Sequence, residues 1–295
     1  MSEFIWIKKT LFLTTSFLAL LCGYGTQADV NQVTGWSCSG PKNATLDADS
    51  QANLDTLLKS LADKAPKNNG FSQTHAGKGG KRLYGLAQCR GDVSAADCRH
   101  CLRNATWTSS AQCGARREGI VWLRWCLLRY SDAIFFGTWD RAGIAKVNQT
   151  TPLEDPNVVP SGVDLMNGLV GTAPRHVSMF DTNAVGVGPL ERRFGMAQCT
   201  RDVDPAGCRE CLVAQLETFR ARIGNRRGWE IYGSSCSLWY HDYRFYFDSV
   251  TANQGDTLIP VFNKMDYVLP FFVSNYRFII CPFGCRWEEV LSELV

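Results

Sequence analysis

The chain carries one decisive stretch of sequence twice. The first copy reads Gly85-Leu-Ala-Gln-Cys-Arg-Gly-Asp-Val-Ser-Ala-Ala-Asp-Cys-Arg-His-Cys-Leu102, and the second reads Gly195-Met-Ala-Gln-Cys-Thr-Arg-Asp-Val-Asp-Pro-Ala-Gly-Cys-Arg-Glu-Cys-Leu212. Four cysteines in and beyond the first copy recur 110 residues later: Cys89, Cys98, Cys101 and Cys126 return as Cys199, Cys208, Cys211 and Cys236. A period of this length is that of a whole domain. The chain is therefore a tandem duplication.

Two further cysteines of the first unit have no counterpart in the second. At the same spacing from Cys38 and Cys113, the second unit holds Asn148 and Ile223. Two cysteines that are missing together indicate a bonded pair, since the loss of one alone would leave an odd thiol. We predict a Cys38–Cys113 disulfide, and we expect the second unit, which lacks it, to be the less stable one.

Composition places the chain among ordinary globular proteins. It has 295 residues, a net charge of +3, 45% hydrophobic and 20% charged residues. These values exclude a disordered or collagen-like chain, and the charge is too small for a dedicated nucleic-acid binder. Thirteen cysteines are typical of an oxidising compartment rather than of the cytosol.

The first residues predict export. Lys8 and Lys9 precede an apolar run over 11–22, and small residues at Thr26 and Ala28 suit cleavage before Asp29. An N-terminal membrane anchor is the alternative, but the run is shorter than the roughly 20 residues that a bilayer requires. We expect 1–28 to be a signal peptide and the mature protein to be secreted to the extracellular space.

A second apolar segment, 267–283, contains Arg277 near its centre. A central arginine opposes membrane insertion by about 3 kcal/mol, so we expect no membrane association. The segment belongs to a tail, 251–295, that differs from both repeats. The tail holds Cys281 and Cys285, for which the sequence indicates neither a role nor a pairing.

The sequence pattern of each unit predicts an α+β layer. Apolar spacing predicts an amphipathic helix over 45–64, and Ser94 caps a second helix that runs to about 109. In the second unit, Asp204 and Pro205 begin the equivalent helix, which runs to about 223. The first unit has four predicted strands: 71–75, 83–90, 120–130 and 134–138. Two helices over an antiparallel sheet is the expected fold of each unit.

The strand 120–130 predicts an apolar face without a helix to cover it. If Cys126 faces the helices, Ile120 and Trp122 share its face and odd-numbered residues point away. The predicted uncovered face comprises Val121, Leu123, Trp125 and Leu127 in the first unit and Trp229, Ile231 and Trp239 in the second. An exposed apolar patch marks an interface. It would serve either to dock the two units on each other, in one chain or between copies, or as a platform for a ligand or partner.

The Cys-x8-Cys-x2-Cys pattern, with Cys89, Cys98 and Cys101 and its repeat in the second unit, resembles the signature of the ginkbilobin-like domain. This domain is also called the salt-stress-response/antifungal domain. Two copies after a signal peptide resemble the plant cysteine-rich repeat secretory proteins. They also resemble the ectodomains of cysteine-rich receptor-like kinases and of plasmodesmata-located proteins.

The resemblance implies two disulfide-stapled domains, 29–140 and 141–250, each with two helices on a five-stranded antiparallel sheet. The implied disulfides are Cys38–Cys113, Cys89–Cys98, Cys101–Cys126, Cys199–Cys208 and Cys211–Cys236.

The family's mannose site does not carry over to this chain. The single-domain antifungal member binds mannose through an Asn, an Arg and a Glu, and the matching positions here hold Ser39, Ile120 and Ser131. The last two positions hold Glu230 and His241 in the second unit. Carbohydrate binding through other residues, such as exposed tryptophans, stays open.

No residue pattern indicates an enzyme. The pair Cys98 and Cys101 lacks the partners of a zinc or redox site, so we read both as structural and expect no metal or other cofactor. Four arginines, Arg220, Arg222, Arg226 and Arg227, gather at the end of the second unit's second helix. They suit a solvated helix end, with contact to an acidic polysaccharide or phospholipid as the alternative. Sequons at Asn43, Asn104 and Asn148 predict glycosylation.

Two functional hypotheses follow. The first is a secreted non-catalytic binding protein that recognises a glycan or a cell-surface protein in defence or stress responses. The second is an interaction or co-receptor-like module, a truncated receptor-like ectodomain, without sugar binding.

Overall fold

A computed structural model describes residues 31–39, 45–148 and 150–247. The predicted signal peptide 1–28, the sequon at Asn43, and the tail with Cys281 and Cys285 lie outside these residues. Among the described residues, no helix is long and apolar enough to cross a membrane.

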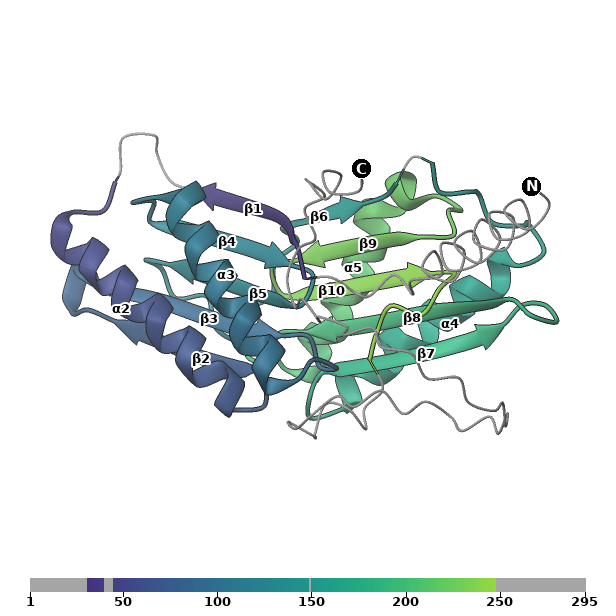
Figure 1. The fold of residues 1–295 in the computed structure, drawn as a ribbon, viewed down its shortest axis with the longest axis horizontal. Coiled ribbons are helices and arrows are strands. Elements are labelled where there is room, and N and C mark those ends of the chain that lie inside the picture. The colour runs from purple at the N-terminus through teal and green to yellow at the C-terminus, as the bar shows by residue number, and fades with distance from the viewer. Residues whose placement is uncertain (1–30, 40–44, 149, 248–295) are drawn as a thin grey trace, which may run out of the picture. The chain divides into compact units, whose positions relative to one another are not determined.

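The first repeat is a five-stranded antiparallel sheet with two helices across one face (Figure 1). Its strands lie in the order β1-β4-β5-β3-β2. In chain order the elements are β1 (Val33–Ser39), α2 (Ala48–Lys64), β2 (Phe71–Ala76), β3 (Leu83–Cys89), α3 (Ala95–Cys113), β4 (Glu118–Leu123) and β5 (Cys126–Ser131).

The second repeat has the same topology, in the order β6-β9-β10-β8-β7. Its elements are β6 (Gly143–Lys146), α4 (Val159–Thr172), β7 (Phe180–Gly186), β8 (Arg192–Cys199), α5 (Pro205–Ile223), β9 (Trp229–Gly233) and β10 (Cys236–His241). The predicted α+β fold, with two helices on a five-stranded sheet in each repeat, is confirmed.

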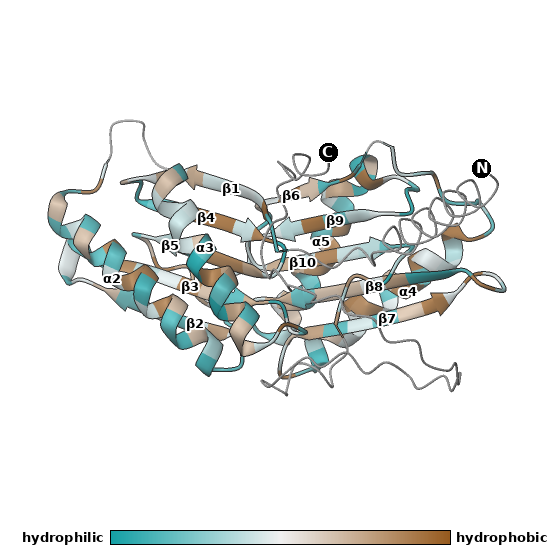
Figure 2. Cartoon of the chain, in the orientation of Figure 1, coloured by the Kyte–Doolittle hydropathy of each residue, from teal (hydrophilic) through white to brown (hydrophobic). Residues whose placement is uncertain are grey.

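The helices begin where their capping residues place them. The Ser94 hydroxyl accepts a hydrogen bond from the backbone N–H of Asp97 at 3.1 Å. The Asp204 carboxylate accepts one from Gly207 N–H at 2.7 Å, and Pro205 follows as the first helical residue. The leucine stripe of α2 is buried in the core of the first repeat. Figure 2 shows hydrophobic and hydrophilic residues interleaved along this helix. Burial of this stripe, rather than helix propensity, provides most of the helix stability.

Within the described residues, five disulfides join helices to strands, in the pairs that the family resemblance implies. Cys89–Cys98 and Cys199–Cys208 link β3 to α3 and β8 to α5, and Cys101–Cys126 and Cys211–Cys236 link the same helices to β5 and β10. Cys38–Cys113 joins the edge strand β1 to the end of α3 and occurs in the first repeat alone.

The prediction of one strand over 120–130 is wrong. The chain turns at Arg124 and Trp125, and β4 and β5 form a hairpin in which Val121 pairs with Leu128. No strand forms over 134–138, where the sequence predicts one. The edge strands β1 and β6, which the sequence analysis does not predict, complete the two sheets.

This hairpin also corrects the predicted uncovered face. Paired residues in a two-residue hairpin have opposite parity, so Val121 and Leu123 lie in the helix-side core with Leu128. Trp125 lies in the turn and packs partly against that core. The same error applies to Trp229 and Ile231, which lie in the core beneath α4 and α5. Of the seven residues predicted for this face, Leu127 and Trp239 lie on it.

The sheet faces that the helices leave uncovered are buried between the two repeats. Six buried residues from both repeats form one cluster there: Ile120, Trp122, Met196, Tyr232, Trp239 and Phe245. Equivalent glutamines bond reciprocally beside it. Gln88 Nε2 donates to Cys199 O at 2.7 Å, and Gln198 Nε2 donates to Cys89 O at 2.9 Å. The Trp122 indole N–H donates to Gly233 O at 2.9 Å. This face is thus an internal interface and is not available to a ligand.

Candidate ligand pocket of the second repeat

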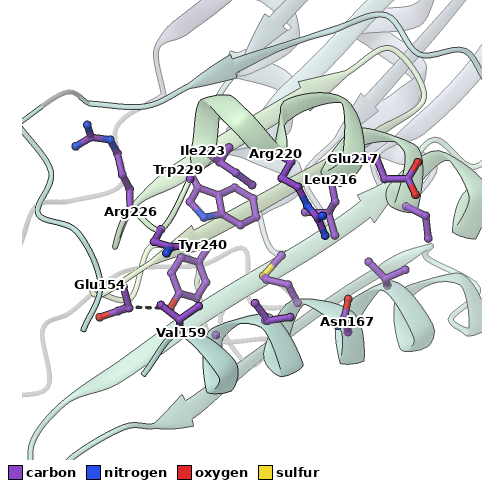
Figure 3. Close-up of a pocket in the computed structure, with 17 residues that line it drawn as sticks. Glu154, Val159, Asn167, Leu216, Glu217, Arg220, Ile223, Arg226, Trp229 and Tyr240 are labelled. Carbon is purple, nitrogen blue, oxygen red and sulfur yellow. Dashed lines mark hydrogen bonds between the residues drawn. The ribbon is translucent and has the colours of Figure 1, made fainter. Parts of the chain in front are cut away.

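A pocket of about 600 Å³ opens between α4 and α5 in the second repeat. Figure 3 shows side chains of the two helices across the pocket from each other, with Trp229 and Tyr240 from the sheet at one end. Helix α4 contributes Val159, Gly162, Val163, Met166, Asn167 and Val170, and α5 contributes Val213, Leu216, Glu217, Arg220 and Ile223.

Two side-chain volumes at the pocket differ between the repeats. The helices align on the Ala-Pro pair that follows each of them, at Ala65 and Ala173. On this alignment the buried Leu54 of α2 corresponds to Gly162 of α4, so a core side chain is missing between the helices. A Cβ atom on Gly162 would lie 2.5 Å from the Tyr240 hydroxyl oxygen, so glycine is required there. Across the pocket, Gly119 of β4 corresponds to Trp229 of β9.

The pocket walls are apolar where the first repeat is polar. Val163 occupies the position of Asp55, and Val213 the position of Arg103. Two further pocket residues follow the same trend: Val159 stands at the position of Gln51, and Leu216 at the position of Thr106. Val163 is 51% exposed and Val213 is 40% exposed at the rim. The second repeat therefore presents an apolar cleft where the first presents a solvated helix surface.

A buried ion pair lies at the inner end of the pocket. The Glu154 carboxylate accepts hydrogen bonds from Arg193 Nε at 2.5 Å, Arg193 Nη2 at 2.6 Å and the Tyr240 hydroxyl at 3.1 Å. The hydrogen bonds from Arg193 hold the pKa of Glu154 below its usual value, so the carboxylate is charged at neutral pH. Burial, followed by the negative charge of Glu154, raises the pKa of Tyr240. The Trp229 ring stacks on Tyr240, with centroids 5.6 Å apart and an interplanar angle of 21°.

This ion pair replaces apolar residues of the first repeat. Glu154 N–H donates to Asn225 O just as Leu46 N–H donates to Ala115 O, which makes Glu154 the counterpart of the buried Leu46. Arg193 stands 110 residues after the buried Leu83. The carboxylate and the guanidinium satisfy each other without a ligand.

The predicted arginine cluster divides into separate roles. Arg220 and Arg226 line the pocket, and Arg226 Nη1 donates to Thr151 O at 2.7 Å. Arg227 Nε lies 3.4 Å from the Glu154 carboxylate. Arg222 is exposed and is not a lining residue. The reading of all four as a solvated helix end is wrong for Arg226 and Arg227, because both interact with residues that precede α4.

Three of the positions at which the resemblance places sugar-binding residues, Ser131, Glu230 and His241, make internal polar contacts, whereas Ile120 lies in the apolar cluster between the repeats. In the first, the Ser131 hydroxyl donates to Glu118 at 3.0 Å. In the second, Glu230 accepts from Arg124 at 2.9 Å, from Tyr232 at 2.6 Å, and lies 3.1 Å from His241 Nε2. Burial raises the pKa of Glu230, but the His241 and Arg124 contacts outweigh it and the pKa is lowered. Glu230 therefore bonds to residues of its own chain.

The sequence analysis missed the pocket, because its residues are ordinary apolar ones. A comparison of equivalent helix positions in the two repeats would have found the signal, in glycine for Leu54 and valine for Asp55. Asn104 and Asn148, two of the predicted glycosylation sites, are both exposed, and their glycosylation stays a prediction. The described residues contain no group of three His, Cys, Asp or Glu side chains that could hold a metal ion.

Comparisons with known proteins agree with this architecture. The sequence matches the salt stress response/antifungal family over residues 37–133 and 163–243. It is 31% identical over 209 residues to the antimicrobial ginkbilobin-2-like protein of Castanea crenata, covering 70% of this chain and 86% of the relative. It is 29% identical to cysteine-rich repeat secretory protein 55 of Arabidopsis thaliana, covering 82% of this chain and 92% of the relative.

A solved structure shows the same fold. The crystal structure of the tandem DUF26 ectodomain of the cysteine-rich receptor-like protein PDLP8 from Arabidopsis thaliana superposes with a TM-score of 0.62. It is 23% identical and covers 72% of this chain and 98% of the ectodomain.

Proposed function

The chain belongs to the salt stress response/antifungal family, whose members here are secretory proteins and receptor ectodomains, and from this premise we propose that it is a non-catalytic binding protein of defence or stress responses. The protein is extracellular, as these relatives are. Domains 29–140 and 141–250 would act as one unit, with recognition by the second domain. The ligand would be a glycan or a group displayed by a cell-surface molecule.

One observation carries this proposal: the second repeat has a pocket between α4 and α5, with valines at its rim where the first repeat has charged residues. A volume of about 600 Å³ lies within the range of about 300–1,000 Å³ for small-ligand sites. Two apolar residues at its rim are partly exposed, Val163 and Val213. Water-exposed valines at positions that are charged in the sister repeat are a feature of a binding surface.

The test is a binding screen with the full chain, secreted and glycosylated. A glycan array that includes mannose oligosaccharides and a small-molecule thermal-shift screen would be run on the wild type and on the pocket variant Val159→Gln/Val163→Asn. These substitutions make the α4 rim polar, as it is in the first repeat. We expect a ligand that binds the wild type and fails with the variant. Binding that the variant leaves unchanged, or silence with a folded protein, would overturn the pocket as the recognition site.

A second candidate is an interaction module, the function that receptor-ectodomain relatives suggest. Its support is the exposure of two tryptophans on the first repeat, with Trp107 on α3 at 72% and Trp36 on β1 at 48%. Tryptophan is enriched among residues that dominate binding energy at protein interfaces. Loss of a cell-surface partner with Trp107→Ala, and retention with the pocket variant, would favour this function over the first.

A further inference from the structure

We infer that the pocket between α4 and α5 takes a single-chain amphipathic anion, an aliphatic chain with one acidic head group. This inference rests on the proposed function, since it names the ligand class for the same pocket. It follows from three properties of the lining: the apolar walls, the satisfied polar groups at the inner end, and the charge at the rim.

The walls suit an aliphatic chain. Met166, Val170 and Ile223 are buried and continue the lining inward from the exposed rim valines. An apolar ligand would remove the exposed surface of Val163 and Val213 from water, and the burial of this apolar surface would stabilise the complex. Ile223 stands where the first repeat has Cys113, so the disulfide that ties the end of α3 to β1 has no counterpart beside the pocket.

The inner end does not suit a sugar. Sugar recognition requires hydrogen-bonding groups that face the ligand, but the Glu154 carboxylate is already bonded by Arg193 and Tyr240. Trp229 is 6% exposed and its ring stacks on Tyr240, so it offers no open face for a sugar ring. A polar ligand at this end would lose its bonds to water without equivalent replacements.

The rim suits an acidic head group. Glu154 is neutralised by Arg193, and the guanidinium of Arg220 lies at the rim, one turn after Glu217 on α5. Arg220 is exposed, and the described residues show no ion pair to it. A carboxylate placed there would gain charge-assisted hydrogen bonds from the guanidinium. The head group would lie toward solvent and the chain would lie between the helices.

Calorimetry with the full chain tests both halves of this inference. The probe is sodium dodecanoate below its micelle concentration at pH 7, with dodecanol as its uncharged match. The double substitution Val159→Gln/Val163→Asn should lower the affinity for both probes at least tenfold. The control is Val177→Asn, because Val177 is 96% exposed outside the pocket and its substitution should change neither affinity.

The head group is tested separately. Arg220→Gln should lower the affinity for dodecanoate about fivefold, which is the effect of one partly exposed charge contact. The affinity for dodecanol should not change. Arg222→Gln is the control, since Arg222 lies in the same last turn of α5 without lining the pocket. Near-ultraviolet circular dichroism would confirm that each variant is folded.

The outcomes separate this inference from the proposed function. Equal loss of dodecanoate and dodecanol with Arg220→Gln would overturn the anionic head group. Failure of both probes to bind the folded wild type would overturn the amphipathic ligand class. If a glycan then binds the wild type and not the pocket variant, the proposed function stands while this inference fails.

Discussion

The two repeats have the same strand order, and each has the same two helix–strand disulfides, but the contact between the two helices differs. In the first repeat, Leu54 fills the space between the helices and Cys38–Cys113 ties the edge strand to α3. In the second, Gly162 stands at the position of Leu54 with the Tyr240 hydroxyl against it, and both line a pocket together with Ile223. This difference indicates that the sheet and its two helix–strand disulfides are sufficient for the fold. The contact between the helices can then vary, and in the second repeat it forms a pocket.

The inner core shows a second difference. Leu46 and Leu83 are apolar core residues of the first repeat, and Glu154 and Arg193 form a buried ion pair at the equivalent positions. A buried ion pair contributes little net stability compared with apolar residues, because both charges lose water. The second repeat therefore lacks two of the stabilising features of the first. Each prediction below changes one of these differences or the contact between the repeats.

The largest effect is expected from Glu154→Leu. This substitution leaves the Arg193 guanidinium, which is 2% exposed, without its carboxylate partner. We expect the free energy of unfolding to fall by about 3–5 kcal/mol, measured by urea denaturation. The double variant Glu154→Leu/Arg193→Leu recreates the apolar pair of the first repeat, and we expect it to be at least as stable as the wild type.

An exposed partner of the same arginine provides the control. Glu191 lies 3.3 Å from Arg193 and is 58% exposed, so Glu191→Leu should change stability by less than about 1 kcal/mol. If the double variant is as unstable as Glu154→Leu, the ion pair cannot be a simple substitute for Leu46 and Leu83.

Removal of the disulfide that the second repeat lacks is expected to have the next largest effect. Cys38 and Cys113 are separated by 75 residues, and loop-closure entropy makes such a bond worth about 4 kcal/mol. Cys38→Ala/Cys113→Ala should therefore bring the stability of the first repeat down toward that of the second. Hydrogen exchange resolved by repeat would measure this, with faster exchange in α3 and β1 and little change in α5.

The Cys89–Cys98 disulfide of the same repeat, which closes a much shorter loop, provides the comparison for Cys38–Cys113. Cys89 and Cys98 are 9 residues apart, and the same relation gives about 3 kcal/mol for Cys89→Ala/Cys98→Ala. Equal acceleration of exchange in both repeats after loss of Cys38–Cys113 would show that the bond does not act on the first repeat alone.

A smaller effect is expected at the contact between the repeats. Gln88 donates to Cys199 O and accepts from Arg201 N–H at 2.9 Å, whereas its counterpart Gln198 donates to Cys89 O. Loss of a buried hydrogen-bonding partner costs about 1–3 kcal/mol. Gln88→Ala should therefore destabilise more than Gln198→Ala in chemical denaturation. Equal losses would mean that the bond to Arg201 contributes nothing.

Apolar spacing and capping residues predicted the helices, and the family resemblance implied the disulfide pairs. Because disulfides record which elements are adjacent, these pairs identified the helix–strand contacts made by Cys101 and Cys211. The face of β4 was assigned wrongly because Arg124 and Trp125 carry no turn signal, so two strands read as one. The pocket lies between two helices, α4 and α5, and residues of both line it. A pattern along one helix cannot reveal such a space, because the space belongs to both helices.

The smallest effect is expected from mild acid. The hydrogen bonds from Arg193 lower the pKa of Glu154 in the folded protein below its ordinary value near 4.5. The ionised carboxylate therefore stabilises the fold fully above that ordinary value, and this stability is lost as the pH falls through the lowered pKa. Between pH 7 and 5 the wild type should lose almost none of it. Below about pH 4.5, urea denaturation should show a steeper loss for the wild type than for Glu154→Leu/Arg193→Leu. Parallel pH profiles would mean that Glu154 does not carry the acid sensitivity of the second repeat. The first repeat would be the internal control, since Leu46 and Leu83 do not titrate.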